Sequence, residues 1–179
     1  SYSNYPMTQM SLASSMNLDY LDPEHLKKEW SEALPDFVSQ IWNNKAMDFL
    51  ASYGYEFPTF HSGVAATEID NGRFVKPDTF ALSELQRVYI AMTPLRSPVE
   101  RMTRSGEANR VLFVVEELGK VRRGERPMFV FAHMMSPHMP HTFDAEGKPV
   151  SEKPDYYKGF RDETNCLNGR FLTMIDRIQ

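Results

Sequence analysis

The chain has 179 residues, of which 41% are hydrophobic and 25% are charged, which is enough length and apolar content for one globular domain. The formal net charge of −4, without a Lys/Arg-rich face, argues against a nucleic-acid-binding protein. The single cysteine, Cys166, excludes an internal disulfide, and the helical pattern around it indicates a buried, inert thiol. The sequence contains no apolar run of about 18 residues, so it predicts no membrane span.

The N-terminal stretch predicts a short helix over residues 8–17. Pro6 prevents an earlier helix from continuing through it. Thr8 therefore lies at or next to the helix N-terminus, where backbone N–H groups have no partner within the helix. On position alone, its hydroxyl is best explained as an N-cap. The alternative is a nucleophilic threonine, because the same amides would bind the oxygens of a phosphate or sulfate ester.

Two helices are expected next. Residues 23–34 begin with proline after Asp22, which predicts a helix capped by the aspartate. Residues 36–52 carry apolar side chains at helical spacing, which predicts one further helix that ends at Gly54.

Residues 55–63 predict the first strand. Pro58 cannot donate a backbone hydrogen bond, which favours an edge position or a bulge. His61 lies near the end of this strand; it is a secondary site candidate, with a hydrogen-bonded structural histidine as the other interpretation. Residues 64–78 are polar and irregular, which is typical of a surface loop.

Helical spacing returns in residues 82–92 and again in residues 107–121. Pro94 and Pro98 are expected to close the first of these helices. The second ends in a basic stretch, Arg122 to Arg126, which leads into the next strand.

The stretch 127–144 contains three of the five histidines. Residues 128–132 form an apolar run that suits a strand covered on both faces. His133 follows at the strand end, and His138 and His141 lie in a proline-rich loop. Ligands and catalytic groups collect at the carboxyl ends of strands, so a metal or anion site is plausible here, although the histidine spacing matches no general zinc motif and an ordinary surface loop is the alternative.

The chain closes with a hairpin-like polar loop over residues 144–154, turning at Glu146-Gly147, and an amphipathic helix from Phe160 to Ile178. The order of helices and strands predicts an α/β layered domain with a mostly parallel sheet. Two clear strands are too few for an independent sheet, so we expect residues 1–179 to form a single partial domain of a longer protein.

Several motifs, in this order, resemble sulfatase-like hydrolases of the alkaline phosphatase superfamily, including the lipid A phosphoethanolamine transferases. They cover most of the chain. They are Asn4-Tyr5-Pro6-Met7-Thr8-Gln9-Met10-Ser11-Leu12-Ala13-Ser14-Ser15-Met16-Asn17, Tyr20-Leu21-Asp22, Gly54-Tyr55, Phe60-His61-Ser62-Gly63, Phe129-Val130-Phe131-Ala132-His133, Pro137-His138-Met139-Pro140 and Phe143-Asp144-Ala145-Glu146-Gly147.

The resemblance implies a three-layer α/β/α sandwich and transfer of a phosphoryl or sulfuryl group through a covalent intermediate on a metal-activated hydroxyl. Thr8 matches the nucleophile, which also contacts the metal. His133 and His138 match the His-x-x-x-x-His segment that contacts the metal centre or the anionic group of the substrate, and His61 is a further substrate-binding candidate. His141 has no counterpart. The implied cofactor is a divalent metal, with zinc favoured over manganese or calcium.

The chain departs from the family pattern in three features. The upstream metal-binding aspartate and the late Asp-His or Asp-Asn pair are absent, as is the Cys/Ser-x-Pro-x-Arg motif of the sulfatases proper. We therefore expect further metal ligands and strands from the remainder of the same protein, and an inactive fragment in isolation. Family members are often membrane-anchored, with the catalytic domain outside the cytoplasm. The alternative from another class is a non-catalytic α/β interaction domain with structural histidines.

Overall fold

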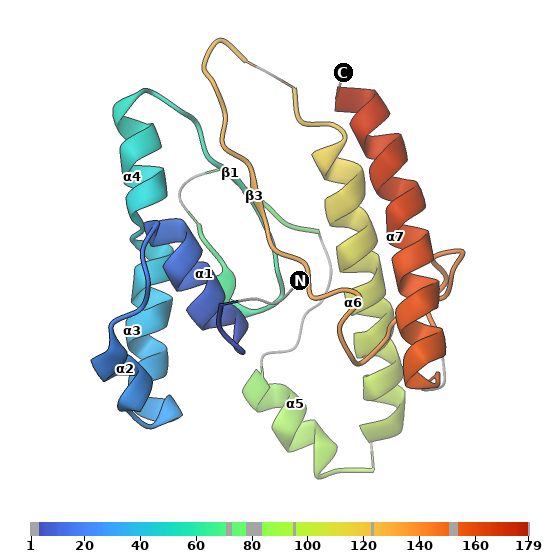
Figure 1. The fold of residues 1–179 in the computed structure, drawn as a ribbon. Helices are drawn as coiled ribbons and strands as arrows, with labels where there is room; N and C mark the ends of the chain where they lie inside the picture. Colours follow the sequence, from blue (N-terminus) through green and yellow to red (C-terminus); the bar gives the residue numbers. More distant parts are fainter. Residues whose placement is uncertain are drawn as a thin grey trace. The chain divides into compact units, whose positions relative to one another are not determined.

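The computed structural model describes residues 4–70, 73–77, 84–94, 96–122, 124–150 and 154–178 (Figure 1). The chain divides into two compact units, each described here by itself. Unit 1 comprises Ser1–Phe74 and Arg123–His133, and unit 2 comprises Val75–Arg122 and Met134–Gln179. Both helices and a small sheet are present, which confirms a mixed α/β chain.

Unit 1 begins with four helices: α1 (Thr8–Asn17), α2 (Pro23–Lys27), α3 (Trp30–Trp42) and α4 (Lys45–Ser52). Helix α1 packs against α3 and α4. Their apolar faces form a core that includes the fully buried Phe37 and Ile41. Asp22 caps α2, as predicted, by accepting a hydrogen bond from the Glu24 amide at 2.9 Å.

The prediction of a single helix over residues 36–52 is wrong, because the helix is interrupted at Asn44. This side chain is 1% exposed. Its Oδ1 accepts from the Met47 amide and its Nδ2 donates to the Ile41 carbonyl, both at 2.9 Å. Asn44 thus caps the start of α4 and also satisfies a carbonyl at the end of α3. The expected helix over residues 23–34 is likewise divided between α2 and α3.

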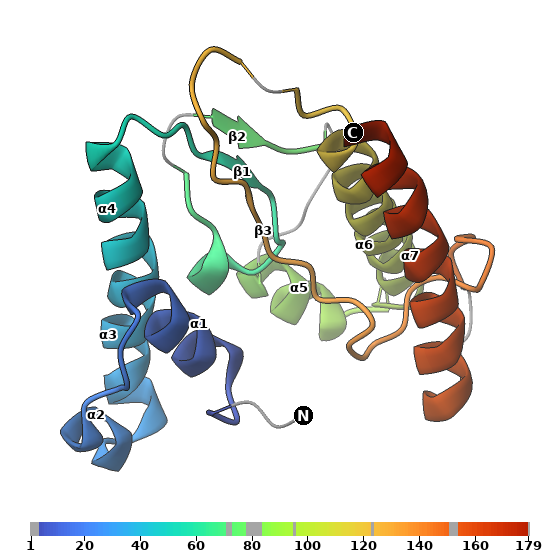
Figure 2. The ribbon, with the colours of Figure 1, turned by 45° about the horizontal axis from the view of Figure 1, so that its top comes forward.

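The sheet has three short strands in the order β2-β1-β3, shown side by side in Figure 2: β1 (Pro58–Phe60), β2 (Arg73–Val75) and β3 (Phe131–Ala132). Strands β1 and β3 run parallel, with Thr59 opposite Phe131 and Phe60 opposite Ala132.

Three expectations about this sheet need correction. β1 is central rather than an edge, and Pro58 is tolerated because it is the first residue of the strand. The expected loop over residues 64–78 contains a 3-10 turn, η1 (Ala65–Thr67), as well as β2. β3 is only partly buried, so the strand covered on both faces is not found in the described residues.

The described residues of unit 2 form three helices: α5 (Glu84–Ala91), α6 (Arg96–Leu118) and α7 (Tyr156–Ile178). Helices α6 and α7 lie alongside each other (Figure 1) and share a core that includes Val111, Phe143 and Leu167. None of the described helices combines the length and apolar composition needed to cross a bilayer.

The expected helix over residues 107–121 in fact begins at Arg96, so Pro98 lies inside α6 instead of closing the preceding helix. Proline is compatible with the first helical turn, because the amide it lacks has no partner there. The turn at Glu146-Gly147 is confirmed: Gly147 has a φ of +83° and its amide donates to the Asp144 carbonyl at 3.0 Å. The buried position of Cys166 is also confirmed.

Candidate functional site

Two of the predicted site histidines, His61 and His133, follow the carboxyl ends of two neighbouring strands in unit 1. Because Phe60 pairs with Ala132 in parallel register, His61 and His133 are the next residues on two neighbouring strands. Both imidazoles are partly buried. The carboxyl end of a parallel strand pair is where binding groups gather in α/β proteins, so the structure brings these two residues to a position suited to a site.

A single turn orients both rings. The His133 Nδ1 atom lies 2.9 Å from Thr67 Oγ1, and the His61 Nδ1 atom lies 2.6 Å from Glu68 Oε1. Thr67 and Glu68 are consecutive residues at the end of η1. Contacts to Nδ1 fix the ring plane and the direction of Nε2, which is how histidines that bind metals or anions are commonly oriented.

The turn is itself held by buried hydroxyls. Ser62 and Thr67 are both fully buried, and their oxygens lie 3.1 Å apart. The Glu68 carboxylate also accepts a hydrogen bond from the Gly63 amide at 3.0 Å. These contacts tie η1 to the end of β1 and leave the two imidazoles little rotational freedom.

Thr8 is the first residue of α1, as the sequence predicts. The N-cap interpretation of its hydroxyl is wrong: Met7 occupies the cap position, and no side chain caps the helix. The Thr8 side chain is exposed. Within the described residues it forms no polar contact with His61 or His133, so its role as a nucleophile rests on its position at the helix N-terminus.

His138 belongs to unit 2 and is exposed. Its Nδ1 atom lies 2.6 Å from the Met139 carbonyl oxygen, which can only accept a hydrogen bond. The proton of the neutral ring is therefore on Nδ1, which makes Nε2 the acceptor atom. The imidazole lines a pocket of about 360 Å³ together with Pro137, Met139, Tyr156 and Phe160.

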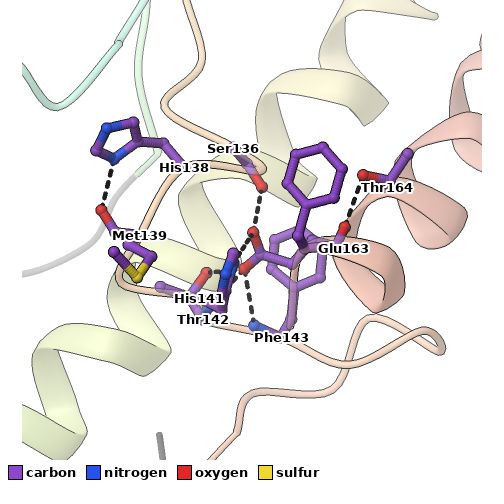
Figure 3. Close-up of polar contacts among 9 residues, drawn as sticks. Ser136, His138, Met139, His141, Thr142, Phe143, Glu163 and Thr164 are labelled. Atoms are coloured by element: carbon purple, nitrogen blue, oxygen red, sulfur yellow. Dashed lines mark hydrogen bonds and ion pairs between the residues drawn. The ribbon is translucent and has the colours of Figure 1, made fainter. Parts of the chain in front are cut away.

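The structure also shows a buried pair that the sequence analysis missed. His141 is 4% exposed, and its Nδ1 atom lies 3.2 Å from Oε2 of Glu163, which is 1% exposed (Figure 3). His141 Nε2 is buried without a partner in the described part of the chain. One signal in the sequence could have indicated the pair: Glu163 follows Phe160 by three residues and precedes Leu167 by four, so it interrupts an apolar helix face.

Ion pairs on the exposed side of α7 shift the pKa of a neighbouring carboxyl. The Asp162 Oδ2 atom lies 2.6 Å from Lys158 Nζ. The hydrogen bond and charge of Lys158, with a smaller contribution from Arg161, hold the pKa of Asp162 below its ordinary value. Asp162 is therefore a half-buried carboxylate that pairs with Lys158, and its contacts differ from those of the adjacent, buried Glu163.

The described residues do not by themselves form a metal site. No group of three or more His, Cys, Asp or Glu side chains among them lies close enough together to bind one ion. The predicted ligands are divided between the units, with Thr8 and His133 in unit 1 and His138 in unit 2. The described residues thus supply too few ligands to bind the expected divalent metal.

Comparisons of the chain with protein-family models, curated proteins and solved structures found no match. The resemblance to sulfatase-like hydrolases accordingly rests on the sequence motifs alone.

Proposed function

We propose that this chain is part of a hydrolase or transferase that acts on phosphate or sulfate esters through a covalent threonine intermediate. The observation that supports it best is the placement of His61 and His133 at one sheet edge, each with Nδ1 held by a neighbouring side chain. Two imidazoles fixed in this way can donate hydrogen bonds to the oxygens of an anionic ester. In this proposal further strands of the same protein complete a three-layer α/β/α sandwich.

Thr8 acts as the nucleophile in this proposal. Its exposed hydroxyl begins a helix of 10 residues, where first-turn amides and the helix dipole favour an anionic group. The Thr8 oxygen forms a bond to phosphorus or sulfur as its hydroxyl proton passes to water, while the bond to the ester oxygen breaks and the departing alkoxide takes up a proton from water. A second alcohol or water then attacks the threonine ester and gives up its proton, and the released Thr8 oxygen takes up a proton to regenerate the hydroxyl.

The proposal extends to a divalent metal, zinc first and manganese or calcium as alternatives, and to a membrane-anchored protein with this domain outside the cytoplasm. Such a metal would increase the acidity of the threonine hydroxyl. The described residues do not complete a metal site. The steps above therefore involve only residues of this chain, the ester and water.

The test is turnover by the full-length protein with p-nitrophenyl phosphate, bis-p-nitrophenyl phosphate and p-nitrophenyl sulfate, with each metal added in turn. We expect Thr8→Ala to reduce turnover by roughly 10³-fold or more while the protein stays folded. Ser15→Ala is the matched control, because Ser15 is an exposed hydroxyl residue on the same helix. Equal turnover in the two variants would contradict the nucleophile assignment.

A second candidate is a non-catalytic α/β interaction domain with structural histidines. The observation in its favour is that His61, His133 and His141 each contact a protein side chain. This candidate predicts no turnover by the wild type with any of the three esters.

A further inference from the structure

Several groups of the loop that carries His138 contact the Glu163 carboxylate. Oε2 accepts from Ser136 Oγ at 2.9 Å and lies 3.2 Å from His141 Nδ1. Oε1 accepts from the amide and the hydroxyl of Thr142, and from the Phe143 amide at 3.4 Å. Figure 3 shows these groups converging on one side chain of α7.

These contacts hold both ends of a short segment. Ser136 precedes residues 137–140, and His141 follows them, so the same carboxylate binds the chain on either side of His138. With only four residues between the two attachment points, the segment has few conformations to choose from. The loop also packs directly against the helix: a Cβ atom placed on Gly159 would overlap the His141 ring.

The hydrogen-bond pattern requires an acceptor-only side chain at position 163. The amides of Thr142 and Phe143 can only donate, and they use Oε1. His141 completes the pattern by donating from Nδ1 to Oε2, which places its ring hydrogen on the Glu163 side and leaves the buried Nε2 as an acceptor.

We propose that Glu163 is a positioning residue for His138, holding the loop in the conformation that presents this imidazole at the pocket it shares with Tyr156 and Phe160. The inference takes from the proposed function only the class of ligand, an anionic phosphate or sulfate ester, which would contact His138 in this pocket. Glu163 itself touches no substrate. It acts through Ser136 and His141, which in turn determine the backbone on which the His138–Met139 hydrogen bond is made.

Glu163→Gln tests this with almost no change in volume. In E163Q the side-chain oxygen can still accept from the Thr142 and Phe143 amides, but an NH₂ group replaces Oε2. That group faces the Nδ1–H of His141, so the imidazole must move its hydrogen to the buried Nε2, which has no partner. The contact between position 163 and His141 then survives only with its direction reversed and with a buried Nε2–H that has no acceptor, which weakens the attachment on one side of the His138 segment.

The experiment compares wild type, E163Q and the control Asp162→Asn by ¹⁵N NMR of the histidine rings and by titration with phenyl phosphate. Asp162 is the adjacent acid on α7 and binds Lys158 rather than the loop. We expect E163Q to keep its helical circular dichroism, to change the His141 tautomer, and to lose the single Nδ1–H form of His138. Phenyl phosphate should bind His138 about 10-fold more weakly in E163Q and with unchanged affinity in D162N.

The outcomes separate this inference from the proposed function. If wild type shows no His138 response to phenyl phosphate but E163Q still disturbs the His138 ring, the ligand contact of His138 fails and the positioning role stands; failure of the proposed function is measured separately, by the turnover of Thr8→Ala. If E163Q only lowers the melting temperature, with the His138 tautomer and phosphate affinity as in wild type, Glu163 is merely structural and the inference is wrong.

Discussion

The Nδ1 atom of His133 lies 2.9 Å from the Oγ1 atom of Thr67, a residue 66 positions earlier in the chain. Thr67 is fully buried, and its hydroxyl also lies within hydrogen-bonding distance of Ser62 Oγ and the Val64 carbonyl. The contact therefore links the end of β3 to the turn that follows β1. The Thr67 hydroxyl therefore helps to orient the His133 ring.

Thr67→Val should destabilise the protein by about 1–3 kcal/mol, because valine has the same shape but leaves the polar atoms around it without the hydroxyl. The free energy of unfolding in urea measures this. Thr173→Val is the control, since Thr173 is exposed and its hydroxyl only donates to the Gly169 carbonyl of its own helix. Equal losses in the two variants would show that the Thr67 contacts add nothing.

Asn44→Ala should lower the free energy of unfolding by about 1–2 kcal/mol, because it removes the cap of α4 and leaves the Met47 amide and Ile41 carbonyl without this side chain. Asn43→Ala, at the exposed neighbouring position, should change stability by less than about 0.5 kcal/mol. Thermal unfolding followed by circular dichroism distinguishes the two. A similar melting temperature for both variants would contradict the capping role.

Gly159→Ala and Gly169→Ala should have opposite effects although both glycines lie in α7. A Cβ on Gly159 would overlap the His141 ring, so we expect a loss of about 1–3 kcal/mol from overpacking. A Cβ on Gly169 meets nothing within 4 Å, so the better helix propensity of alanine should stabilise the protein by up to about 1 kcal/mol. Melting temperatures that move in the same direction would refute the contact of Gly159 with His141.

Asp36 should contribute a pH-dependent part of the stability. The hydrogen bond and charge of Lys28, 3.0 Å away, hold the pKa of Asp36 below its ordinary value of 3.8, with a smaller contribution from His25. A lowered carboxyl pKa means that the contribution is present above pH 3.8 and is lost as the pH falls through the lower pKa of the folded protein. The stability difference between wild type and Asp36→Asn, measured in urea at several pH values, should shrink over that acidic range. A difference that is constant with pH would rule out this contribution.

Local patterns were sufficient for features that depend on nearby residues. The Asp22 cap needs only the amide of Glu24, the turn at Gly147 needs only the flexibility of glycine, and the start of α1 at Thr8 follows from Pro6 and the apolar spacing. These elements involve interactions over a few residues, and the sequence contains all of the relevant groups side by side.

The sequence failed where neighbouring signals compete. Pro98 reads as a helix end, yet it is accommodated in the first turn of α6. Asn44 reads as one polar residue inside a helical pattern, yet burial of its amide makes it a break and a cap. In both cases local propensity allowed two outcomes, and packing selected one.

The candidate site was decided by the tertiary structure alone. The sequence by itself determined which residue types were present: a threonine at a helix start, histidines at strand ends, and a glutamate within an apolar helix face. Only the parallel register of β1 and β3 places His61 beside His133, and only the packing of residues 136–143 against α7 makes Glu163 a buried acceptor. Pairings across 22 and 66 residues depend on which chain segments share a core, and no local pattern encodes that choice.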